Sequence, residues 1–504
     1  MKTTLIISLL FSFNLFSAEG VLMLAGGGPE GDIGVESDWS YPLYKKLIEN
    51  GDTNGDKKVK VVVISLKKPD SNFMVDYLKS MGADTSENLV VSSRKIANDP
   101  KLMKKIKEAD VVFFRGGNQG EAYQKWKDTL LHKEIRALVE RKGAIGGTSS
   151  GTMALAEYSI TGGKDFSSSE VLSDAHSDLL NDEIHTNTSG IHNDFLNVAE
   201  NLIVDTHCGE RARIGRLMAV MAKATDDFQN KKITGLCLEE KTGVIIQNGK
   251  AKVYGTGLAH FLSETEQTEK DRRANHPLSY TNVRLDALTE GWTFNLNENS
   301  PDLNSIPKNA KKLELKVTCG EAPNNFNFKS SIAKSLNFLE PVDSQFLSIA
   351  PDAYSEEKIE SGDKRKGAIQ TRAFNELEKD PRKSVVLIDQ STTISTPAKN
   401  ILSINSKEKT PAMILDCQEC SYTSQSSFVS TQDDGSNSLY SKGFVNMRVH
   451  IVGESSLYDL SEHRAMLVNK ETNSDGTCIL RPVTSFSSLA ASEREIMKKI
   501  ACKK

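Results

Sequence analysis

Short apolar runs alternate with longer segments of helical periodicity through the first half of the chain. Four of these runs have the length and composition of buried strands, namely Val21–Ala25, Val59–Leu66, Val111–Phe114 and Ala144–Gly147. Each is followed by Gly, Pro or Ser residues that turn the chain. Alternation of this kind is typical of a parallel sheet covered by helices on both faces, so the pattern predicts an α/β domain. Ligands of such sheets gather at the carboxyl ends of the strands.

The pattern changes after residue 233. Thr234–Leu262 consists of short strand-like runs and glycine-containing turns, and Val283–Leu296 continues in the same way. From 300 to 330 the chain is rich in Asn, Pro, Lys and Ser, a composition that marks a boundary. We therefore expect one domain over 19–297, a linker over 298–330 and a separate C-terminal α+β domain over 331–504, whose fold the pattern does not identify.

The first residues have the features of a secretion signal. Lys2 is followed by an apolar run from Leu5 to Phe16 and by the small residues Ser17 and Ala18. This order is typical of a cleaved signal peptide. Neither this run nor any later one reaches the roughly 18 apolar residues of a membrane-spanning helix. We therefore expect a signal peptide over 1–18 and a protein exported to the periplasm or the extracellular space.

Charge and cysteine content narrow the possibilities further. The 504 residues include 63 Lys and Arg against 67 Asp and Glu, a balance that gives no overall field to attract nucleic acid. The seven cysteines permit disulfides in an exported protein, and their odd number leaves at least one without a partner in the chain. Cys417 and Cys420 have the spacing of a metal or redox site, but no second such pair follows, so a local disulfide is expected.

The segment Gly147-Thr148-Ser149-Ser150-Gly151 follows a strand and precedes an expected helix, Thr152–Glu157. This is the context of a nucleophile elbow, in which glycines allow the tight turn that lifts the Ser149 hydroxyl from the sheet. The backbone N–H of the next residue can then point at an oxyanion. The same pattern also fits an ordinary glycine-rich turn, so both interpretations stay open.

Two further segments carry candidate chemistry. The glycine-rich turn Arg115–Gly120 ends the strand Val111–Phe114 and can supply another oxyanion N–H, or it can simply start a helix that Asn118 caps. His207 is a candidate base and is followed within ten residues by Arg211, Arg213 and Arg216. Guanidinium groups bind carboxylates through paired hydrogen bonds, so these arginines predict a carboxylate pocket. A solvated helix face is the alternative.

Together the three segments resemble the cyanophycinase and aspartyl dipeptidase family of serine peptidases. The family has a Gly-Gly-Asp/Asn-Gln turn, then Gly-Thr-Ser-Ala-Gly, then Asp-Gln-His followed by spaced arginines. This chain has Gly116-Gly117-Asn118-Gln119, Gly147-Thr148-Ser149-Ser150-Gly151 and Asp205-Thr206-His207 in the same order and spacing. The resemblance extends from Gly20 to Leu296 and leaves the C-terminal part outside.

The resemblance implies a flavodoxin-like α/β fold, related to class I glutamine amidotransferases, and release of β-aspartyl-arginine dipeptides from the polymer cyanophycin. It implies no metal and no organic cofactor, and its members often form homodimers. Ser149 would be the nucleophile and His207 its base. By position, Gly117 and Ser150 would form the oxyanion hole, and Gln119, Asp205, Thr206, Arg211, Arg213 and Arg216 would bind substrate.

The third member of the triad has several candidates. A glutamate that follows an aspartate looks like the histidine's partner in the family, and the matching residue is Glu240, after Glu239. Asp165 or Glu170 lies where some members have their acid. We prefer Glu240. Thr206 stands in place of a glutamine, and Cys208 in place of a frequent phenylalanine. Two alternatives therefore stay open, an aspartyl dipeptidase acting on short peptides and a catalytically inactive binding protein of the same fold.

The segment Asp52–Asp56 begins like a calcium-binding loop. Its twelfth position is Val63, where a bidentate glutamate would be needed. A surface turn is therefore expected here.

Overall fold

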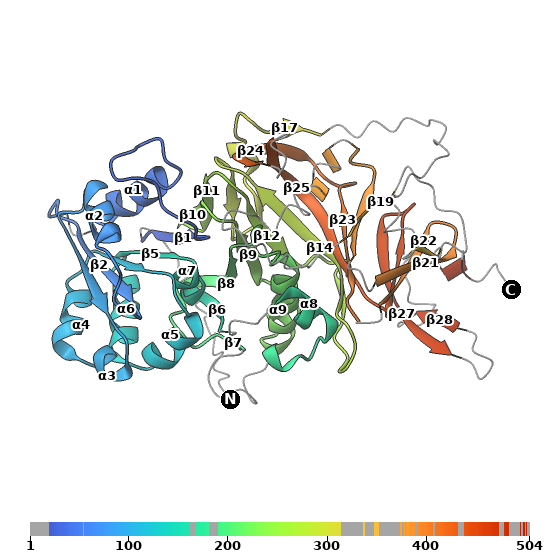
Figure 1. Cartoon of the computed structure of the whole chain (residues 1–504), viewed down its shortest axis with the longest axis horizontal. Helices are drawn as coiled ribbons and strands as arrows, with labels where there is room; N and C mark the ends of the chain where they lie inside the picture. Colours follow the sequence, from blue (N-terminus) through green and yellow to red (C-terminus); the bar gives the residue numbers. More distant parts are fainter. Residues whose placement is uncertain are drawn as a thin grey trace, which may run out of the picture.

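The described part of the chain is built on two large sheets and one smaller sheet, shown in Figure 1 as a computed structural model. The structure describes residues 20–313 apart from 54, 162–166 and 181–189, and beyond these 336–337, 347–351, 373–374, 377–378, 380–388, 392–406, 409–431, 438–472, 478–482, 494, 497–498 and 500. The expected signal peptide lies outside these residues and stays a prediction. Within these ranges, no helix combines the length and the apolar character needed to cross a membrane.

The first sheet joins nine strands of the described residues in the order β16-β15-β11-β10-β1-β5-β4-β2-β3. Its parallel part consists of β1 (Leu22–Ala25), β2 (Lys60–Ser65), β3 (Thr85–Val90), β4 (Val111–Phe114) and β5 (Ala144–Thr148). The antiparallel part is β10 (Thr242–Gln247), β11 (Lys250–Gly255), β15 (Thr293–Asn295) and β16 (Ser300–Pro301). The four predicted strands are confirmed as β1, β2, β4 and β5. A strand buried on both faces needs an uninterrupted apolar run, which is why these were visible in the sequence.

Helices cover both faces of the parallel strands. One face is packed by α1 (Tyr41–Glu49) and α2 (Phe73–Ser80), and the other by α4 (Pro100–Lys107), α5 (Gln119–Trp126), α6 (Leu130–Glu140) and α7 (Ser150–Leu155), with the short α3 (Arg94–Ala97) beside α4 and α5. Side chains of β2 alternate between the two layers, because Val61 and Val63 pack with α1 and α2 whereas Val62 and Ile64 pack with α4 and α6. The predicted α/β class is thus confirmed.

The strand order departs from a flavodoxin-like sheet in one place. That sheet has the order 2-1-3-4-5. Strands β2 to β5 occupy its first four places, since β3 lies beside β2, β2 beside β4 and β4 beside β5. The fifth place is taken by β1, which comes first in the chain and pairs with β5 in parallel. The flavodoxin-like assignment therefore remains a prediction.

The second sheet joins thirteen strands of the described residues, and its path runs β19-β20-β23-β25-β14-β12-β9-β8-β6-β7. Its strands are β6 (Ala156–Ile160), β7 (Ile191–His192), β8 (Ala199–Thr206), β9 (Thr234–Leu238), β12 (Ala259–Ser263), β13 (Glu269–Asp271), β14 (Ser279–Leu288), β17 (Lys311–Lys312), β19 (Leu347–Pro351), β20 (Ser384–Ile388), β23 (Ala412–Asp416), β24 (Tyr422–Thr431) and β25 (Ser438–Val452). One face of β8 and β9 packs against the first sheet through Val204 and Leu236. The other face is covered by α8 (Ser168–Ser173) and α9 (Ile214–Asp227).

The C-terminal residues take part in this second sheet. Strand β25 pairs with β14 in antiparallel register, with Arg284 opposite Arg448. A third sheet of the described residues contains β18 (Leu336–Asn337), β21 (Thr392–Ala398), β22 (Ile401–Ser406), β26 (Ser456–Asp459), β27 (Arg464–Thr472) and β28 (Cys478–Pro482). In Figure 1 these strands lie at the end of the molecule away from α1 to α6. The domain boundaries 298 and 330 stay a prediction, although one sheet extends across them.

Two details of the sequence analysis are settled by the structure. Cys417 and Cys420 form the expected local disulfide. The Asp52 segment is a turn, because the two carboxylate oxygens of Asp52 accept hydrogen bonds from the N–H groups of Gly55 and Lys57 at 2.9 and 3.1 Å. One expectation needs correction, since the helix after Ser149 ends at Leu155 and Glu157 already lies in β6. The reason is that Tyr158 and Ile160 are buried beside β8.

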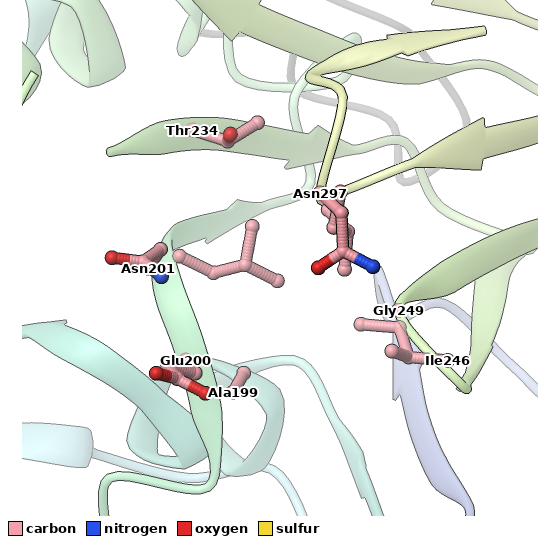
Figure 2. A pocket seen from close by; sticks show the side chains of 9 residues that line it. Ala199, Glu200, Asn201, Thr234, Ile246, Gly249 and Asn297 are labelled. Carbon is pink, nitrogen blue, oxygen red and sulfur yellow. The ribbon is translucent and has the colours of Figure 1, made fainter. Parts of the chain in front are cut away.

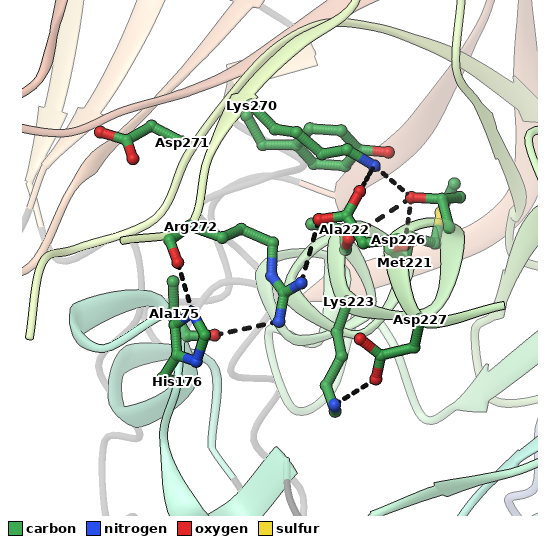
Figure 3. A network of polar contacts seen from close by, with 12 residues as sticks. Ala175, His176, Met221, Ala222, Lys223, Asp226, Asp227, Lys270, Asp271 and Arg272 are labelled. Carbon is green, nitrogen blue, oxygen red and sulfur yellow. Dashed lines mark hydrogen bonds and ion pairs between the residues drawn. The ribbon is translucent and has the colours of Figure 1, made fainter. Parts of the chain in front are cut away.

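A polar network fixes the end of α9 to the sheet (Figure 3). Lys270 contacts Asp226 at 2.6 Å and Glu264 at 2.9 Å, and Arg272 contacts the second oxygen of Asp226 at 3.0 Å. Arg272 also donates to the backbone carbonyl of Ala175, just beyond α8. Because its C-terminal end is held in this way, α9 presents its N-terminal end at a fixed position, and this is the end that lies near the candidate site.

Candidate active site

Three turns meet where the two large sheets come together. Ser149 follows β5 of the first sheet, whereas His207 and Glu240 follow β8 and β9 of the second. The loop after β1 joins them. The carbonyls of Ala25, Gly26 and Gly27 accept hydrogen bonds from the N–H groups of Ser149, His207 and Lys241 at 3.0, 3.1 and 2.9 Å, respectively. These are the carboxyl ends of parallel strands, where the sequence analysis placed a ligand site.

Ser149 occupies a strained turn between β5 and α7. Its backbone has φ 53° and ψ −125°, an unusual conformation for a residue with a side chain. Gly151 permits the turn because a Cβ there would clash with the carbonyl of Phe114. Thr152 secures the helix start, since its hydroxyl donates to the carbonyls of Ala25 and Gly147. The local geometry is that of a nucleophile elbow.

Ser149, His207 and Glu240 form a continuous hydrogen-bonded row. The Ser149 Oγ lies 2.7 Å from the Nε2 atom of His207, and the Nδ1 atom of His207 lies 2.6 Å from the Glu240 Oε1. The histidine side chain is 9% exposed and that of Glu240 is 28% exposed. The two ring nitrogens of one histidine therefore contact a serine on one side and a carboxylate on the other, as a general base with an orienting acid does.

The surroundings of His207 favour its neutral form. Burial lowers the pKa of His207 below its ordinary value, and the positive charges of Arg211 and Arg213 lower it further. Glu240 acts in the opposite direction and offsets part of the effect. A neutral imidazole can accept the proton of a serine hydroxyl at pH 7.

The other candidate acids have different roles. Glu239 is buried, and its carboxylate accepts a hydrogen bond from the N–H of Leu258 at 2.9 Å and lies 3.3 Å from His260. Glu170 forms a capping box with Ser167 at the start of α8. Asp165 lies outside the described residues. Among the described candidates, the acid beside His207 is the preferred residue, Glu240.

The glycine turn after β4 lies against the nucleophile. A Cβ at Gly116 would be 3.2 Å from the Cβ of Ser149, and one at Gly117 would be 4.0 Å from the Oγ of Ser150. Asn118 caps α5, because its side-chain oxygen accepts a hydrogen bond from the N–H of Glu121 at 2.9 Å. Gln119 is the half-buried first residue of this helix. The turn thus starts a helix and also borders Ser149, so the two interpretations of this segment are compatible.

Asp205 and Arg216 contact each other beneath the site. The Nε and Nη2 atoms of Arg216 donate to the two carboxylate oxygens of Asp205 at 2.7 and 2.5 Å, and the side chains are 5% and 0% exposed. Burial alone would raise the pKa of Asp205, but Arg216 and Arg213 lower it below its usual value. Thr206 is also fully buried. The assignment of these three side chains to substrate binding stays a prediction, and in this structure Asp205 and Arg216 contact each other close to the turn that carries His207.

Arg211 and Arg213, the other two arginines of this segment, lie near His207. Arg211 is exposed and Arg213 is half-buried, and the charges of both act on His207. Arg213 also donates to the carbonyl of Thr206 at 2.9 Å. Arg211 and Arg213 thus bring positive charge close to His207, and the Nη1 atom of Arg213 also lies 3.4 Å from the Asp205 Oδ1.

The sequence analysis missed Gly26, Gly27 and Gly28. Gly27 has φ 101°, and a Cβ there would be 2.5 Å from the imidazole of His207. A Cβ at Gly28 would be 3.1 Å from that of Glu240. Three consecutive glycines directly after the first strand were the available signal.

A disulfide between Cys208 and Cys237 was also missed. Cys208 follows His207 directly, and Cys237 lies in β9, three residues before Glu240. The bond thus connects the turn of the base to the strand that leads to the acid. With seven cysteines the sequence allowed many pairings, so this one could not be deduced.

A pocket of about 50 Å³ lies away from these residues (Figure 2). It is lined by Ala199, Glu200, Asn201, Leu202, Thr234, Ile246, Gly249, Leu296 and Asn297. These residues include the amino ends of β8 and β9, opposite to the ends that carry His207 and Glu240. The pocket is large enough for water and too small for a peptide. Nowhere in the described ranges do three His, Cys, Asp or Glu side chains cluster as metal ligands would.

Comparison with known proteins shows which family part of the chain resembles. Residues 72–254 match peptidase family S51. A cyanophycinase from Thermosynechococcus vestitus is 25% identical over 250 residues, which span 48% of this chain and 70% of that protein. A cyanophycinase from Trichormus variabilis is 27% identical over 224 residues, which span 43% and 67%. The crystal structure of a peptidase from an acI-B1 Actinobacterium is 18% identical with a TM-score of 0.37, covering 56% of this chain and 98% of that one. Over residues 72–254 the chain is similar to peptidase family S51, and together with the cyanophycinase relatives this match indicates that it is a serine-type peptidase.

Proposed function

We propose that this protein is an exported peptidase that hydrolyses cyanophycin or related β-aspartyl peptides with Ser149, His207 and Glu240 as its catalytic triad. The observation that carries the proposal is the row of hydrogen bonds of 2.7 and 2.6 Å from the serine through both imidazole nitrogens to the carboxylate. An inactive binding protein would have no need to maintain this row, so the geometry favours the enzyme.

The reaction follows from the positions of these groups. The Ser149 Oγ attacks the aspartyl carbonyl carbon while its proton moves to the Nε2 atom of His207. Glu240 holds the Nδ1–H and stabilises the imidazolium that forms. The protonated histidine then gives its proton to the leaving amine as the C–N bond breaks, which leaves an aspartyl ester on Ser149. Water, deprotonated by His207, cleaves this ester and restores the serine.

The negative charge on the carbonyl oxygen needs donors beside Ser149. We assign this role to the N–H groups of Gly117 and Ser150, because the turn after β4 lies against the start of α7. The side chain of Ser150 differs from the alanine of the family pattern, but its N–H is the same. The oxyanion hole is therefore compatible with this replacement.

The substrate is inferred from charge and from relatives. Arg211 and Arg213 lie near His207 and can bind the free carboxylate of an aspartyl unit, and Gln119 borders the same turn as Gly117. Two relatives are named cyanophycinases. Short aspartyl dipeptides are the second candidate substrate, because the residues at positions 206 and 208 differ from the family pattern.

Export and assembly complete the proposal. The charged start and apolar run of residues 1–18 support a signal peptide, and two disulfides in the described residues suit an oxidising compartment. The flavodoxin-like fold is supported by the order of β2 to β5. A homodimer is expected because members of the family that the sequence resembles often form homodimers.

The test uses the mature protein, purified cyanophycin and the Ser149→Ala variant. We expect release of β-aspartyl-arginine by the native protein and none by the variant. Ser71→Ala, which changes an exposed serine on another loop, is the matched control and should retain activity. Turnover of aspartyl dipeptides without release from the polymer would favour the dipeptidase. Equal release by the native protein and Ser149→Ala would overturn the proposed nucleophile.

A further inference from the structure

Glu240 lies in a turn rather than in a strand. Strand β9 ends at Leu238 and β10 begins at Thr242, so residues 239–241 connect the two strands. N–H groups in a turn have no partner in the ladder of a sheet, and nearly all buried ones pair with another group. The position of the acid beside His207 therefore depends on the groups that hold this turn.

The N–H groups of this turn donate to three different segments. The N–H of the residue before Glu240 donates to the carbonyl of Leu258 at 3.1 Å, and that of the residue after it donates to the carbonyl of Gly27 at 2.9 Å. The N–H of Glu240 itself donates to the Glu210 Oε2 at 3.2 Å. A side chain thus holds the backbone of the acid, and a substitution can remove this contact while leaving the main chain unchanged.

Glu210 belongs to the turn that carries the base. This half-buried residue lies three positions after His207, and the N–H of Arg211 closes the turn by donating to the carbonyl of His207 at 2.9 Å. The imidazole contacts the side chain of Glu240 at 2.6 Å, while the Glu210 carboxylate contacts the backbone of Glu240. The turns after β8 and β9 are therefore joined at the acid by the base and also by Glu210.

The carbonyl of Glu240 is held by a second side chain. It accepts a hydrogen bond from the hydroxyl of Thr242 at 3.2 Å. Thr242 is fully buried, and its hydroxyl oxygen also accepts a hydrogen bond from the N–H of Gly257 at 2.8 Å. Because the N–H and the carbonyl of Glu240 are both held, the direction in which its side chain leaves the turn is fixed.

We propose that Glu210 is a positioning residue, which holds Glu240 at hydrogen-bonding distance from His207 by accepting the N–H of Glu240. Glu210 acts through its oxygen as an acceptor rather than through its charge. The inference rests on the proposed function, because it takes Ser149, His207 and Glu240 as the catalytic triad. It makes the turn of the base responsible for the position of the acid.

Two substitutions separate the acceptor from the charge. Glu210→Met removes both oxygens, whereas Glu210→Gln keeps an acceptor and removes the charge. We expect Glu210→Met to lower kcat for release of β-aspartyl-arginine from cyanophycin by about 10- to 100-fold, the effect of one hydrogen bond to a charged group, with little change in KM. Glu210→Gln should lose less than about tenfold, because a neutral amide accepts the same bond more weakly. Glu210→Ala replaces Glu210→Met if the latter does not fold.

The pH dependence of kcat/KM distinguishes positioning from a loss of stability. Burial and the charges of Arg211 and Arg213 lower the pKa of His207, and Glu240 opposes them through its hydrogen bond and its charge. Displacing Glu240 weakens this opposition, so the acid limb of Glu210→Met should lie at lower pH than that of the native protein. Glu210→Gln should keep the native limb. An equal shift in both variants would assign the effect to the charge of Glu210 and overturn the inference.

Glu157 provides a matched control. Its Oε2 atom accepts the N–H of Asn201 at 2.6 Å, which is the same kind of contact near the amino end of β8, away from the triad. Glu157 is half-buried, as Glu210 is. Glu157→Met should lower the melting temperature but retain kcat and the native pH profile. A loss of kcat as large as that of Glu210→Met would attribute the effect to stability and overturn the inference.

Proton NMR provides a readout that does not need turnover. The Nδ1–H proton of His207, held by Glu240, should give a strongly deshielded resonance that is absent from His207→Ala. We expect this resonance in the native protein and in Glu210→Gln, and its loss in Glu210→Met. An undiminished resonance in Glu210→Met would overturn the inference. A native protein that shows the expected pattern but cleaves no β-aspartyl substrate would contradict the proposed reaction and leave the role of Glu210 supported.

Discussion

Within the described residues, a serine, a histidine and a carboxylate meet in the N-terminal region and again in the C-terminal region, and the first of these groups has catalytic geometry. In the N-terminal region, His207 meets Ser149 with its Nε2 atom and Glu240 with its Nδ1 atom. In the C-terminal region, the Nδ1 atom of His463 lies 3.0 Å from Asp416 and 3.3 Å from Ser384. One nitrogen shared between serine and acid cannot relay a proton from one side of the ring to the other.

The serines differ in their backbone as well. Ser149 lies in a strained turn at the end of a strand, whereas Ser384 is the first residue of β20 and is fully buried. Ser384 and Asp416 also share the hydroxyl of Tyr458, which makes their cluster a closed network within the sheet. Residue types alone therefore do not define a hydrolase site. The distribution of contacts over the imidazole ring and access to the serine define it.

Replacing each histidine should give the largest contrast. His207→Ala removes the base, and we expect kcat to fall by about 10⁴-fold or more with little change in melting temperature. His463→Ala should retain activity and lower the melting temperature, because it opens a buried network. Steady-state kinetics and thermal unfolding of both variants check this. Loss of activity in the His463 variant at temperatures where it is folded would contradict a purely structural role for His463.

Neutralising each carboxylate should give the next effect. Glu240→Gln leaves His207 without an acceptor for its Nδ1–H, and we expect kcat to fall by about 10³- to 10⁴-fold. Asp416→Asn should keep kcat and reduce stability. Glu239→Gln is a stringent control because it is adjacent in sequence but contacts Leu258 and His260. A similar loss of kcat in Glu239→Gln and Glu240→Gln would contradict the assignment of the acid.

Acid should affect the two regions in different ways. The pKa of His207 is lowered, so kcat/KM should decline about tenfold per pH unit only below pH 6.5. Burial lowers the pKa of His450, whose ring packs against Tyr458, to about 4, against the partial opposition of Asp416 and with a further contribution from Arg448. As the pH falls, His450 is therefore protonated in the unfolded chain before it is protonated in the folded protein. The contribution of His450, roughly 3 kcal/mol, is thus complete above pH 6.5 and lost as pH falls towards 4.

Measurement of kcat/KM and of denaturant unfolding across pH 4 to 8 tests both expectations on the same protein. A His450→Gln variant should lack this pH dependence of stability and keep the acid limb of the rate profile. An acid limb centred above pH 6.5 would contradict the described environment of His207.

The disulfides should give the smallest contrast. Cys208 follows His207, and Cys417 follows Asp416, so one disulfide borders each cluster. Replacing Cys208 and Cys237 by serine should lower kcat several-fold, because a displacement of about 1 Å at a catalytic group is enough to slow a reaction. Replacing Cys417 and Cys420 should change stability alone. Unchanged kcat in the first double variant would show that the disulfide does not position the base.

The sequence predicts the first sheet well and the second sheet poorly. The buried strands β1, β2, β4 and β5 appear as uninterrupted apolar runs, a local signal. The pairing of β14 with β25 joins residues as far apart as Arg284 and Arg448, and no local pattern carries that information. For this reason the C-terminal part seemed a separate unit, although its strands extend a sheet of the peptidase region.

The candidate site also combines features that a local sequence pattern reveals with features that depend on residues far apart in the chain. Glycines and a serine in a fixed spacing indicate a tight turn, because few backbone conformations require glycine at those positions. The structure has this turn at Ser149. The pairing of Asp205 with Arg216 could not be deduced, since the sequence does not say whether two opposite charges face each other or a ligand. The glycines after β1 were readable in principle, but their contact with His207 depends on how two sheets meet.

Covalent labelling tests the central claim most directly, because it identifies the nucleophilic serine without assuming a substrate. The mature protein would be treated with diisopropyl fluorophosphate and its peptides analysed by mass spectrometry. We predict one adduct per chain on Ser149, none on Ser384, and none on Ser149 in the His207→Ala variant. An adduct on Ser384, or an unlabelled Ser149 in a protein that hydrolyses β-aspartyl peptides, would contradict the account.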